Sequence, residues 1–309
     1  MNPGLPDFLT RPSTDVTPAA TQICAVMVVY NSDSTLEENI RALLNEVAKL
    51  IVVDNFSEPA SRAMIVELAG ACNFEVIWNK ENVGLAAGLN AGIRRALADD
   101  HYEWITTFDQ DSRVTPGFRE AMFAAYQACP FREKVALIVP RHVLSQEHPG
   151  KIPIQDGPRF REVSVALQSG SFFSRSVLKD VGLFDERFFI DYVDFEFCLR
   201  LRKSGFRIIE AVAAPIYHRV GTPTRHNFLG TSCTVFNHSS VRRYYAARNR
   251  LRVYRRYMLS DPRWIGHDMW SWFKEIVKLM LFESNRREKL AFMARGAWDA
   301  LRGRGGAYA

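Results

Sequence analysis

The chain contains 309 residues with a mass of 35.3 kDa, which is enough for one large domain or two small ones. Apolar residues make up 47% and charged residues 24%, a globular composition that argues against a disordered, collagen-like or disulfide-scaffold protein. The five cysteines form no CxxC pair, so we expect no structural zinc cluster and a reducing compartment.

Charge is distributed unevenly along the chain. The net charge is +6, but residues 241–309 hold 16 Lys and Arg against 6 Asp and Glu, whereas residues 1–240 hold 24 against 28. A basic tail on a mildly acidic body is typical of proteins that meet a phosphorylated substrate, a membrane surface or a nucleic acid. A solvated helix face explains the same charges. No nucleic-acid recognition motif is present, so we expect no nucleic-acid partner.

Neither a membrane-spanning helix nor a signal peptide is expected. No apolar run reaches the ~20 residues of a spanning helix, and the first residues lack a basic start followed by an apolar block. We therefore expect a cytoplasmic protein, either soluble or peripheral at the inner face of the cytoplasmic membrane. Residues 1–20, rich in Pro, Thr and Ala, are predicted to form a flexible arm.

Apolar strands and amphipathic helices alternate over the following residues. The predicted strands are 23–30, 50–53, 74–78, 104–108 and 135–139, and the predicted helices are 34–48, 61–71 and 85–98. Ser34, with Glu37 three residues later, is the predicted N-cap of the first helix. This alternation predicts an α/β fold with a mostly parallel central sheet and helices on both of its faces.

Polar clusters follow the predicted strands where these end. They are Tyr30-Asn31, Asp54-Asn55, residues 79–84 and Asp109-Gln110-Asp111. Ligands of such sheets bind beyond the carboxyl ends of the strands, so these clusters indicate a nucleotide site. The first strand is not followed by GxGxxG and the chain has no GxxxxGK[ST], which argues against a dinucleotide dehydrogenase and a P-loop enzyme.

The Asp109-Gln110-Asp111 segment is the most informative of these clusters. Two carboxylates at i and i+2 can share a hard divalent cation such as Mg²⁺ or Mn²⁺, whose coordination is usually completed by substrate phosphates. A turn with a capping Asp is the alternative. The position directly after an apolar strand favours a metal site.

Five ordered motifs resemble the family 2 glycosyltransferases with the GT-A fold. They are VVYNS (28–32), VVDNFS (52–57), NVGLAAGLNAGI (82–93), FDQDS (108–112) and FDERFFIDYVDFEFCLR (184–200). The likeness covers residues 22–256 and is greatest to bacterial rhamnosyltransferases, which FNHSSVRRYYAARNRL (236–251) also resembles. It implies a GT-A catalytic domain over residues 21–240, followed by a basic, aromatic helical extension over residues 241–309.

The resemblance also implies a reaction and its donor site. The reaction is inverting transfer of L-rhamnose from dTDP-L-rhamnose, with Asp111, Asp109 and His218 at a Mg²⁺ or Mn²⁺ ion. The implied donor-binding residues are Tyr30, Asn31, Asp54, Asn82, Gly84, Asn90, Asp109, Gln110 and Arg248. The start of the helix near residue 84 would favour the diphosphate. Close helix packing explains Gly88 and Gly92 equally well.

Inversion in one displacement needs a base on the acceptor side, and a carboxylate suits this task. By resemblance Asp194 takes this position, with Asp191 as a rival or helper because Val193 stands where many relatives have Glu. On a helix, their spacing of three would place both on one face. Neighbouring aromatic side chains predict burial, which would raise the pKa of the carboxyl. The implied acceptor-side residues are Gly170, Ser171 and Glu196, the last of which could instead pair with Arg200.

The stretch 264–293 mixes Trp and Phe with Lys and Arg. An apolar helix with such residues suits a bilayer interface, and packing on the catalytic domain explains it equally well. The acceptor is left open between a rhamnolipid precursor and a lipid-linked O-antigen or polysaccharide intermediate. The alternatives for the whole protein are a non-catalytic binding protein with the GT-A fold and a family 2 transferase that uses another nucleotide sugar.

Overall fold

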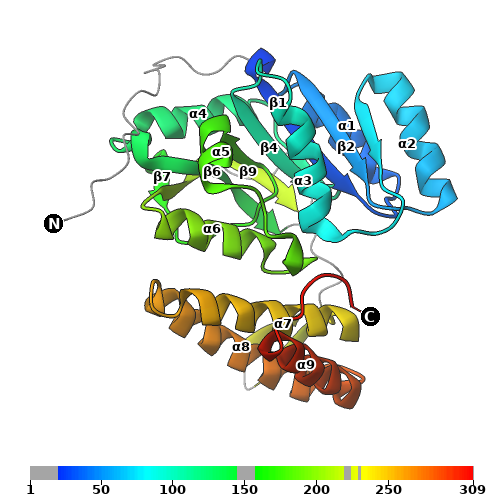
Figure 1. The fold of residues 1–309 in the computed structure, drawn as a ribbon, viewed down its shortest axis with the longest axis vertical. Helices are drawn as coiled ribbons and strands as arrows, with labels where there is room; N and C mark the ends of the chain where they lie inside the picture. The colour runs from blue at the N-terminus through cyan, green and yellow to red at the C-terminus, as the bar shows by residue number, and fades with distance from the viewer. Residues whose placement is uncertain (1–19, 145–156, 219–223, 229–230, 309) are drawn as a thin grey trace.

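The computed structural model describes residues 20–144, 157–218, 224–228 and 231–308 (Figure 1). A central sheet with helices on both faces forms one part of the molecule, and three C-terminal helices lie together beside it (Figure 1). The predicted arm over residues 1–20 falls outside the described residues except for Ala20, which begins a short 3-10 helix, η1 (Ala20–Gln22).

The first half of the chain alternates strands and helices as the sequence predicts. The elements are β1 (Ile23–Val29), α1 (Thr35–Leu44), β2 (Lys49–Asp54), α2 (Pro59–Cys72), β3 (Glu75–Trp78), α3 (Gly84–Leu97) and β4 (Trp104–Asp109). β1 pairs in parallel with β2 and β4, and β2 with β3. Every residue of β1 is buried because helices cover both faces of the sheet, which explains its continuous apolar run.

The second half adds antiparallel strands. Its elements are β5 (Ser112–Val114), α4 (Phe118–Ala128), η2 (Arg132–Lys134), β6 (Val135–Leu144), β7 (Phe160–Glu162), β8 (Ser171–Ser174), α5 (Arg175–Val181), η4 (Glu186–Phe188), α6 (Val193–Lys203) and β9 (Arg207–His218). The sheet order is β3-β2-β1-β4-β8-β6-β9-β5, with β7 paired to β9. β8 is antiparallel to β4 and β6, whereas β6 and β9 are parallel. A separate ribbon consists of β10 (Thr224–Phe228) and β11 (Thr231–Val235).

Two local predictions are decided by the structure. Ser34 is the N-cap residue of α1, as predicted, but its side chain makes no capping bond. The Asp33 carboxylate instead accepts hydrogen bonds from the Thr35 N–H (2.9 Å) and hydroxyl (2.5 Å). A Cβ on Gly88 or Gly92 would press against Val28 or Val26 of β1. Helix packing therefore accounts for both glycines.

The C-terminal extension consists of α7 (Ser240–Tyr257), α8 (Pro262–Phe282) and α9 (Arg286–Leu301). The predicted stretch 264–293 is thus two helices, with a break at Asn285, which has a φ of 55°. α9 packs closely on α7 because Gly296 has no side chain where a Cβ would collide with the Tyr244 carbonyl. Within the described part of the chain, no helix is long and apolar enough to cross a membrane.

Candidate active site

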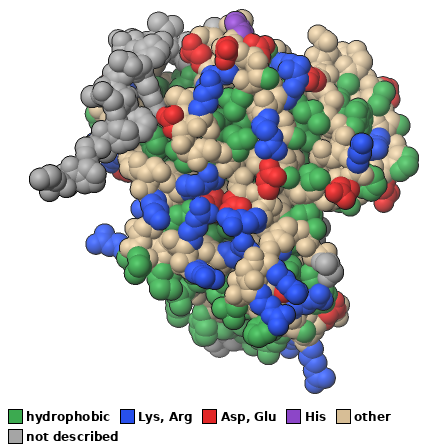
Figure 2. Space-filling model, in the orientation of Figure 1, with side chains coloured by type: hydrophobic (Ala, Val, Ile, Leu, Met, Phe, Trp, Pro, Cys, Tyr) green, Lys and Arg blue, Asp and Glu red, His purple; other side chains and the backbone are tan. Residues whose placement is uncertain are grey.

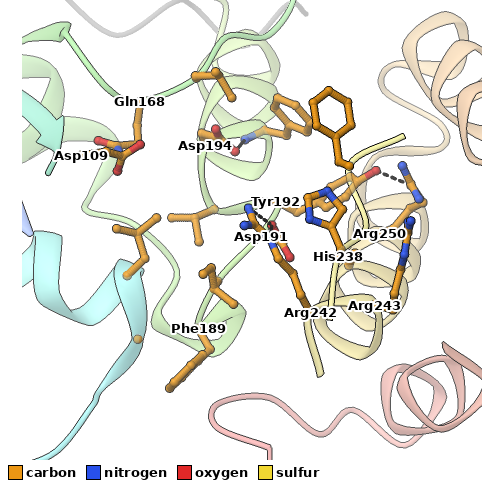
Figure 3. Close-up of a pocket in the computed structure, with 18 of the residues that line it drawn as sticks. Asp109, Gln168, Phe189, Asp191, Tyr192, Asp194, His238, Arg242, Arg243 and Arg250 are labelled. Atoms are coloured by element: carbon orange, nitrogen blue, oxygen red, sulfur yellow. Dashed lines mark hydrogen bonds and ion pairs between the residues drawn. The ribbon is translucent and has the colours of Figure 1, made fainter. Parts of the chain in front are cut away.

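A cavity of about 880 Å³ lies between the strand ends and the C-terminal extension (Figure 3). The predicted residues that line it are Tyr30, Asn82, Gly84, Asp109, Gln110, Asp111, Asp191 and Asp194. The structure therefore brings the predicted metal-binding pair and both candidate bases into one hollow.

Asp109, at the end of β4, is held by the segment that leads into β8. Its Oδ1 accepts a hydrogen bond from Gln168 Nε2 (2.5 Å), and its backbone N–H donates to Ser169 Oγ (3.0 Å). Gln168 lines the cavity next to Asp109 (Figure 3). The antiparallel pairing of β4 with β8 brings this segment to the site. The sequence places Gln168 only by resemblance, in an acceptor-side segment, and does not predict its bond to Asp109, because this pairing joins residues about sixty positions apart.

Gln110 forms hydrogen bonds with the loop that follows β1. Its Oε1 accepts from the Tyr30 N–H (2.7 Å) and the Ser32 hydroxyl (2.9 Å), and its Nε2 donates to the Tyr30 carbonyl (3.2 Å). These bonds hold the backbone of Tyr30, which is 48% exposed and lines the cavity. Gln110 is therefore a positioning residue for Tyr30 in this structure.

The first amides of α3 already have acceptors within the protein. Val83 N–H donates to Asn55 Oδ1 (3.1 Å), Gly84 N–H to Asn82 Oδ1 (3.0 Å) and Leu85 N–H to the Phe189 carbonyl (2.6 Å). The predicted preference of this helix start for the diphosphate stays a prediction, and these three amides contribute to it only if they exchange their present acceptors. The helix start fixes the loop that contains Phe189.

The loop before α6 has an unusual backbone. Phe189, Asp191 and Tyr192 have φ values of 57°, 63° and 64°, a left-handed conformation that non-glycine residues rarely adopt. Such strain persists only where surrounding contacts impose it, and it is typical of functional sites. α6 begins at Val193. The prediction that Asp191 and Asp194 share a helix face is therefore wrong, because Asp191 precedes the helix.

Two buried side chains of α7 hold this loop. Asn249 Nδ2 lies 2.6 Å from the Phe188 carbonyl oxygen, 2.7 Å from that of Ile190 and 2.9 Å from that of Asp191. Arg248 donates to the Arg187 carbonyl (3.2 Å). Both side chains are fully buried. The extension thus sets the geometry of the loop that contains Asp191 and leads into the helix that carries Asp194.

Asp194 has the electrostatics of a base. Burial raises the pKa of its carboxyl to about 7; the Phe195 N–H, which donates to Asp194 Oδ1 (2.9 Å), opposes this shift, and the charges of Asp109 and Asp191 add to it. Asp191 is instead ion-paired with Arg242 (3.2 Å). At neutral pH, therefore, Asp194 is poised to exchange a proton, whereas Asp191 is compensated by a cation.

The extension supplies a wall of the cavity, but through residues other than the predicted Arg248. Its charged residues there are Arg242, Arg243, Arg250, Asp268, Lys274, Glu275, Lys278 and Glu283. Figure 2 shows Lys and Arg side chains gathered where the sheet part and the helical part meet. The charge surplus of residues 241–309 was the available signal. It gave no helix orientation, so it did not identify which cations face the site.

Seven predicted residues do not line the cavity: Asn31, Asp54, Asn90, Gly170, Ser171, Glu196 and Arg248. Asp54 is fully buried and ion-paired with Arg62 (2.7 Å). Asn31 accepts through Oδ1 from the Glu58 N–H (2.8 Å). These contacts give both residues roles within the protein.

The other members of this set also contact protein groups. Asn90 donates to the Phe184 carbonyl (2.8 Å), and Glu196 pairs with Arg200 (3.1 Å), which was the open alternative for this residue. The N–H of Gly170 donates to the Thr107 carbonyl (2.7 Å), and the Ser171 hydroxyl donates to that of Leu167 (2.9 Å). For His218 the structure describes only the backbone, which pairs with Ser112; its side chain lies outside the described residues.

The carboxylates present fit a cation that is shared with a ligand. No group of three or more His, Cys, Asp or Glu side chains that could hold a metal occurs among the described residues. Asp109 and Asp111, however, both line the cavity. Mg²⁺ is usually held by one or two carboxylates together with substrate phosphates, so this pair suits such an ion.

Comparison with known proteins identifies the class of the fold and then the family. The structure of GalNAc-T7 with UDP, GalNAc and Mn²⁺ matches with a TM-score of 0.56 at 12% identity, over 76% of this chain and 48% of that chain, which shows a GT-A fold. Residues 24–182 match the family model described as glycosyl transferase family 2. The chain belongs to this family and is a glycosyltransferase.

Two curated relatives support the same assignment. The dTDP-rhamnosyl transferase RfbF of Shigella flexneri is 30% identical over 240 residues, which cover 74% of this chain and 78% of the relative. The galactofuranosyltransferase GlfT1 of Mycolicibacterium smegmatis is 24% identical over 264 residues, 78% of this chain and 83% of the relative. The predicted α/β fold and the predicted enzyme class are thus confirmed.

Proposed function

We propose that the protein transfers L-rhamnose from dTDP-L-rhamnose to a hydroxyl of a glycolipid or saccharide acceptor, with inversion at the anomeric carbon. The choice of donor is supported by the likeness to RfbF, a dTDP-rhamnosyl transferase. The observation that carries the chemistry is that Asp194, whose pKa is raised to about 7, shares one cavity with Asp109 and Asp111.

On the donor side, Asp109 and Asp111 would hold a Mg²⁺ or Mn²⁺ ion together with the diphosphate. Bound there, the ion would offset the negative charge that develops on the departing diphosphate. Tyr30, held by Gln110, offers a ring at the cavity wall against which a nucleotide base can pack. Gln168 orients Asp109 through its hydrogen bond.

On the acceptor side, Asp194 would act as the base. The acceptor oxygen forms a bond to the anomeric carbon as the bond from that carbon to the diphosphate oxygen breaks. The hydroxyl proton passes to the Asp194 carboxylate, and dTDP leaves with the bonding electron pair. A base whose pKa lies near the working pH combines a useful ionised fraction with enough basicity to take this proton.

Contact with the inner face of the cytoplasmic membrane belongs to the same proposal. Exposed apolar residues on α8 include Trp270, Phe273 and Val277, whose spacing places them on one side of the helix. Trp270 and Phe273 stack with ring centroids 5.5 Å apart, and Lys274 lies beside them. Aromatic and basic side chains in this arrangement suit the headgroup region of an anionic leaflet.

A different donor sugar is the second candidate. The galactofuranosyltransferase GlfT1 shares 24% identity over a similar share of the chain, so the family likeness extends to transferases of other sugars. The two candidates make the same use of Asp109, Asp111 and Asp194 and differ only in the donor.

The test is a transfer assay with purified protein, a panel of nucleotide sugars, glycolipid and saccharide acceptors, and Mg²⁺ or Mn²⁺ added or withheld. We expect transfer from dTDP-L-rhamnose, with the products identified by mass spectrometry. Asp194→Asn should abolish turnover yet bind dTDP normally, whereas Asp111→Ala should weaken metal-dependent dTDP binding.

Asp180→Asn, which removes an exposed carboxyl on α5, is the matched control and should retain activity. Transfer from another nucleotide sugar but not from dTDP-L-rhamnose would exclude the proposed donor. Wild-type turnover by Asp194→Asn would exclude Asp194 as the base.

A further inference from the structure

Helix α8 presents three different faces. One face is buried: Ile265 and Leu279 are nearly inaccessible, and Leu279 packs with Ala247 of α7 and Met293 of α9. A second face lines the cavity with Ser271, Lys274, Glu275 and Lys278. The third face is exposed and apolar, and it carries Met269, Trp270, Phe273, Val277, Met280 and Leu281. The cavity and an open apolar surface are therefore two sides of the same helix.

Lys274 and Lys278 lie one helical turn apart, at the edge between the cavity face and the apolar face. Like charges at this spacing destabilise a helix, so local stability does not explain the pair. Lys278 Nζ donates to the Thr234 carbonyl (3.3 Å), and Lys274 Nζ lies 6.0 Å from the centre of the Trp270 ring. Within the described part of the chain, neither ammonium group has a carboxylate partner.

The other cations of this wall are compensated. Arg250 pairs with Asp268 (3.0 Å), Arg243 with Glu283, and Arg242 with Asp191. Among the described residues of the wall, Lys274 and Lys278 are thus the cations without a carboxylate partner.

The donor does not account for these lysines. Its diphosphate belongs beside Asp109 and Asp111, at the end of β4. In Figure 3, Asp191 and Asp194 lie between Asp109 on one side and the α7 arginines on the other. Lys274 and Lys278 line the same cavity as Asp194, from α8 rather than from the end of β4. A group bound at these lysines therefore occupies a part of the cavity other than the donor's diphosphate.

We propose that Lys274 and Lys278 form an anion subsite for the acceptor. The subsite binds an acidic group of the acceptor, a phosphate or a carboxylate, while the apolar part of the same molecule lies on the exposed face of α8. The acceptor is accordingly an anionic amphiphile. The role of this ligand as acceptor rests on the proposed function, but the binding of an anionic amphiphile does not depend on turnover.

The test is calorimetric titration with amphiphiles that share one twelve-carbon chain, each below its micelle concentration. The probes are dodecyl phosphate, dodecanoate and neutral dodecyl maltoside, with inorganic phosphate as the probe without a chain. We expect at least one acidic amphiphile to bind about tenfold tighter than dodecyl maltoside, because an ammonium group strengthens a hydrogen bond to an anion. The preferred acid distinguishes a phosphate from a carboxylate.

The double variant Lys274→Ala/Lys278→Ala should lose this preference and keep its circular dichroism spectrum. Lys179→Ala/Lys203→Ala removes two exposed lysines of α5 and α6 and should keep the preference. Equal binding of acidic and neutral chains by the wild type, or an unchanged preference in the first variant, would overturn the proposal. If inorganic phosphate bound as tightly as dodecyl phosphate, the proposal that the ligand is an amphiphile would be overturned.

Titration with dTDP and Mg²⁺ separates this outcome from the proposed function. If the wild type binds dTDP but shows no preference for acidic chains, the proposed donor site stands and only the proposed subsite is overturned. If the wild type prefers acidic chains but binds no dTDP, the proposed subsite stands and the proposed donor is overturned.

Discussion

At the scale of single residues, the carboxylates that the sequence predicts for the site differ in their partners. Asp54, Asp191 and Glu196 are paired with arginines at 2.7 to 3.2 Å. Among the residues that the structure describes, Asp194 has no such cation, and its main partner is the backbone N–H of Phe195. Burial without a counter-charge raises the pKa of Asp194 to about 7. The carboxyl that is costly to ionise is thus the one assigned to proton transfer.

The raised pKa predicts a pH-dependent stability difference. The folded protein holds the Asp194 proton more tightly than the unfolded chain, so the wild type loses stability as the pH rises from about 4 to about 7. Asn cannot ionise. We expect Asp194→Asn to gain about 4 kcal/mol of unfolding free energy relative to the wild type over this range, because each pKa unit corresponds to about 1.4 kcal/mol, and no more above it.

Urea unfolding of both proteins without divalent cations, across this pH range, measures the effect. Asp180→Asn controls for the loss of one carboxyl at an exposed position on α5. A stability difference between wild type and Asp194→Asn that stays constant with pH would show that the pKa of the Asp194 carboxyl is not raised.

At the scale of elements, the sequence predicts those features that depend on neighbouring residues. The apolar run of β1 and the repeating leucines of α3 give their positions within one or two residues. The strand-end rule also places Asp109 and Asp111 at the correct edge. The contacts that the sequence did not predict join residues far apart in the chain. One amide group at the start of α3 is bonded to Phe189, and Arg248 is bonded to backbone carbonyls of residues about sixty positions away.

Helix α7 and the loop before α6 form a unit that the sequence does not reveal. Asn249 is fully buried and lies within hydrogen-bonding distance of three loop carbonyls. Asn249→Ala should free the left-handed backbone at Asp191 and displace Asp194. We expect kcat to fall about 10- to 100-fold with little change in the donor KM, because misplacing a reacting group by about 1 Å has costs of this order.

Initial-rate kinetics at varied donor concentration separate the two parameters. Asn45→Ala, at an exposed position after α1, is the control and should resemble the wild type. A rise in the donor KM at unchanged kcat would contradict the positioning role, because it would mean that Asn249 acts on donor binding.

At the scale of the whole molecule, the C-terminal extension completes the site. Without α7 and α8 the cavity would lack the wall that contains Arg242 and Lys274, and the loop with Asp191 would lose its clamp. The sequence predicts helices and positive charge here. It does not predict which face turns toward the strand ends, because the helices pack on one another and on the loop through residues such as Gly296 and Asn249.

The outward face of the extension leads to a prediction for the intact protein. Trp270 and Phe273 are 58% and 54% exposed, and basic residues such as Lys274 flank them. The protein should therefore sediment with vesicles of phosphatidylcholine and phosphatidylglycerol, and less with phosphatidylcholine alone. Raised salt should weaken the binding, since it screens the charge between lysines and lipid phosphates. Trp270→Ser/Phe273→Ser should weaken it by about 10- to 100-fold, because two aromatic rings no longer enter the leaflet.

Phe56→Ser/Val66→Ser is the matched control for the vesicle experiment. These two apolar side chains are 50% and 59% exposed, close to the values of the α8 pair, but they lie before and on α2, outside the extension. If α8 is the surface that meets the membrane, this variant sediments like the wild type. If both double variants lost vesicle binding equally, exposed apolar area anywhere on the protein would contribute to membrane binding, and α8 would have no special part in it. The cavity, whose wall α8 helps to form, would then have no fixed orientation toward a lipid-borne acceptor.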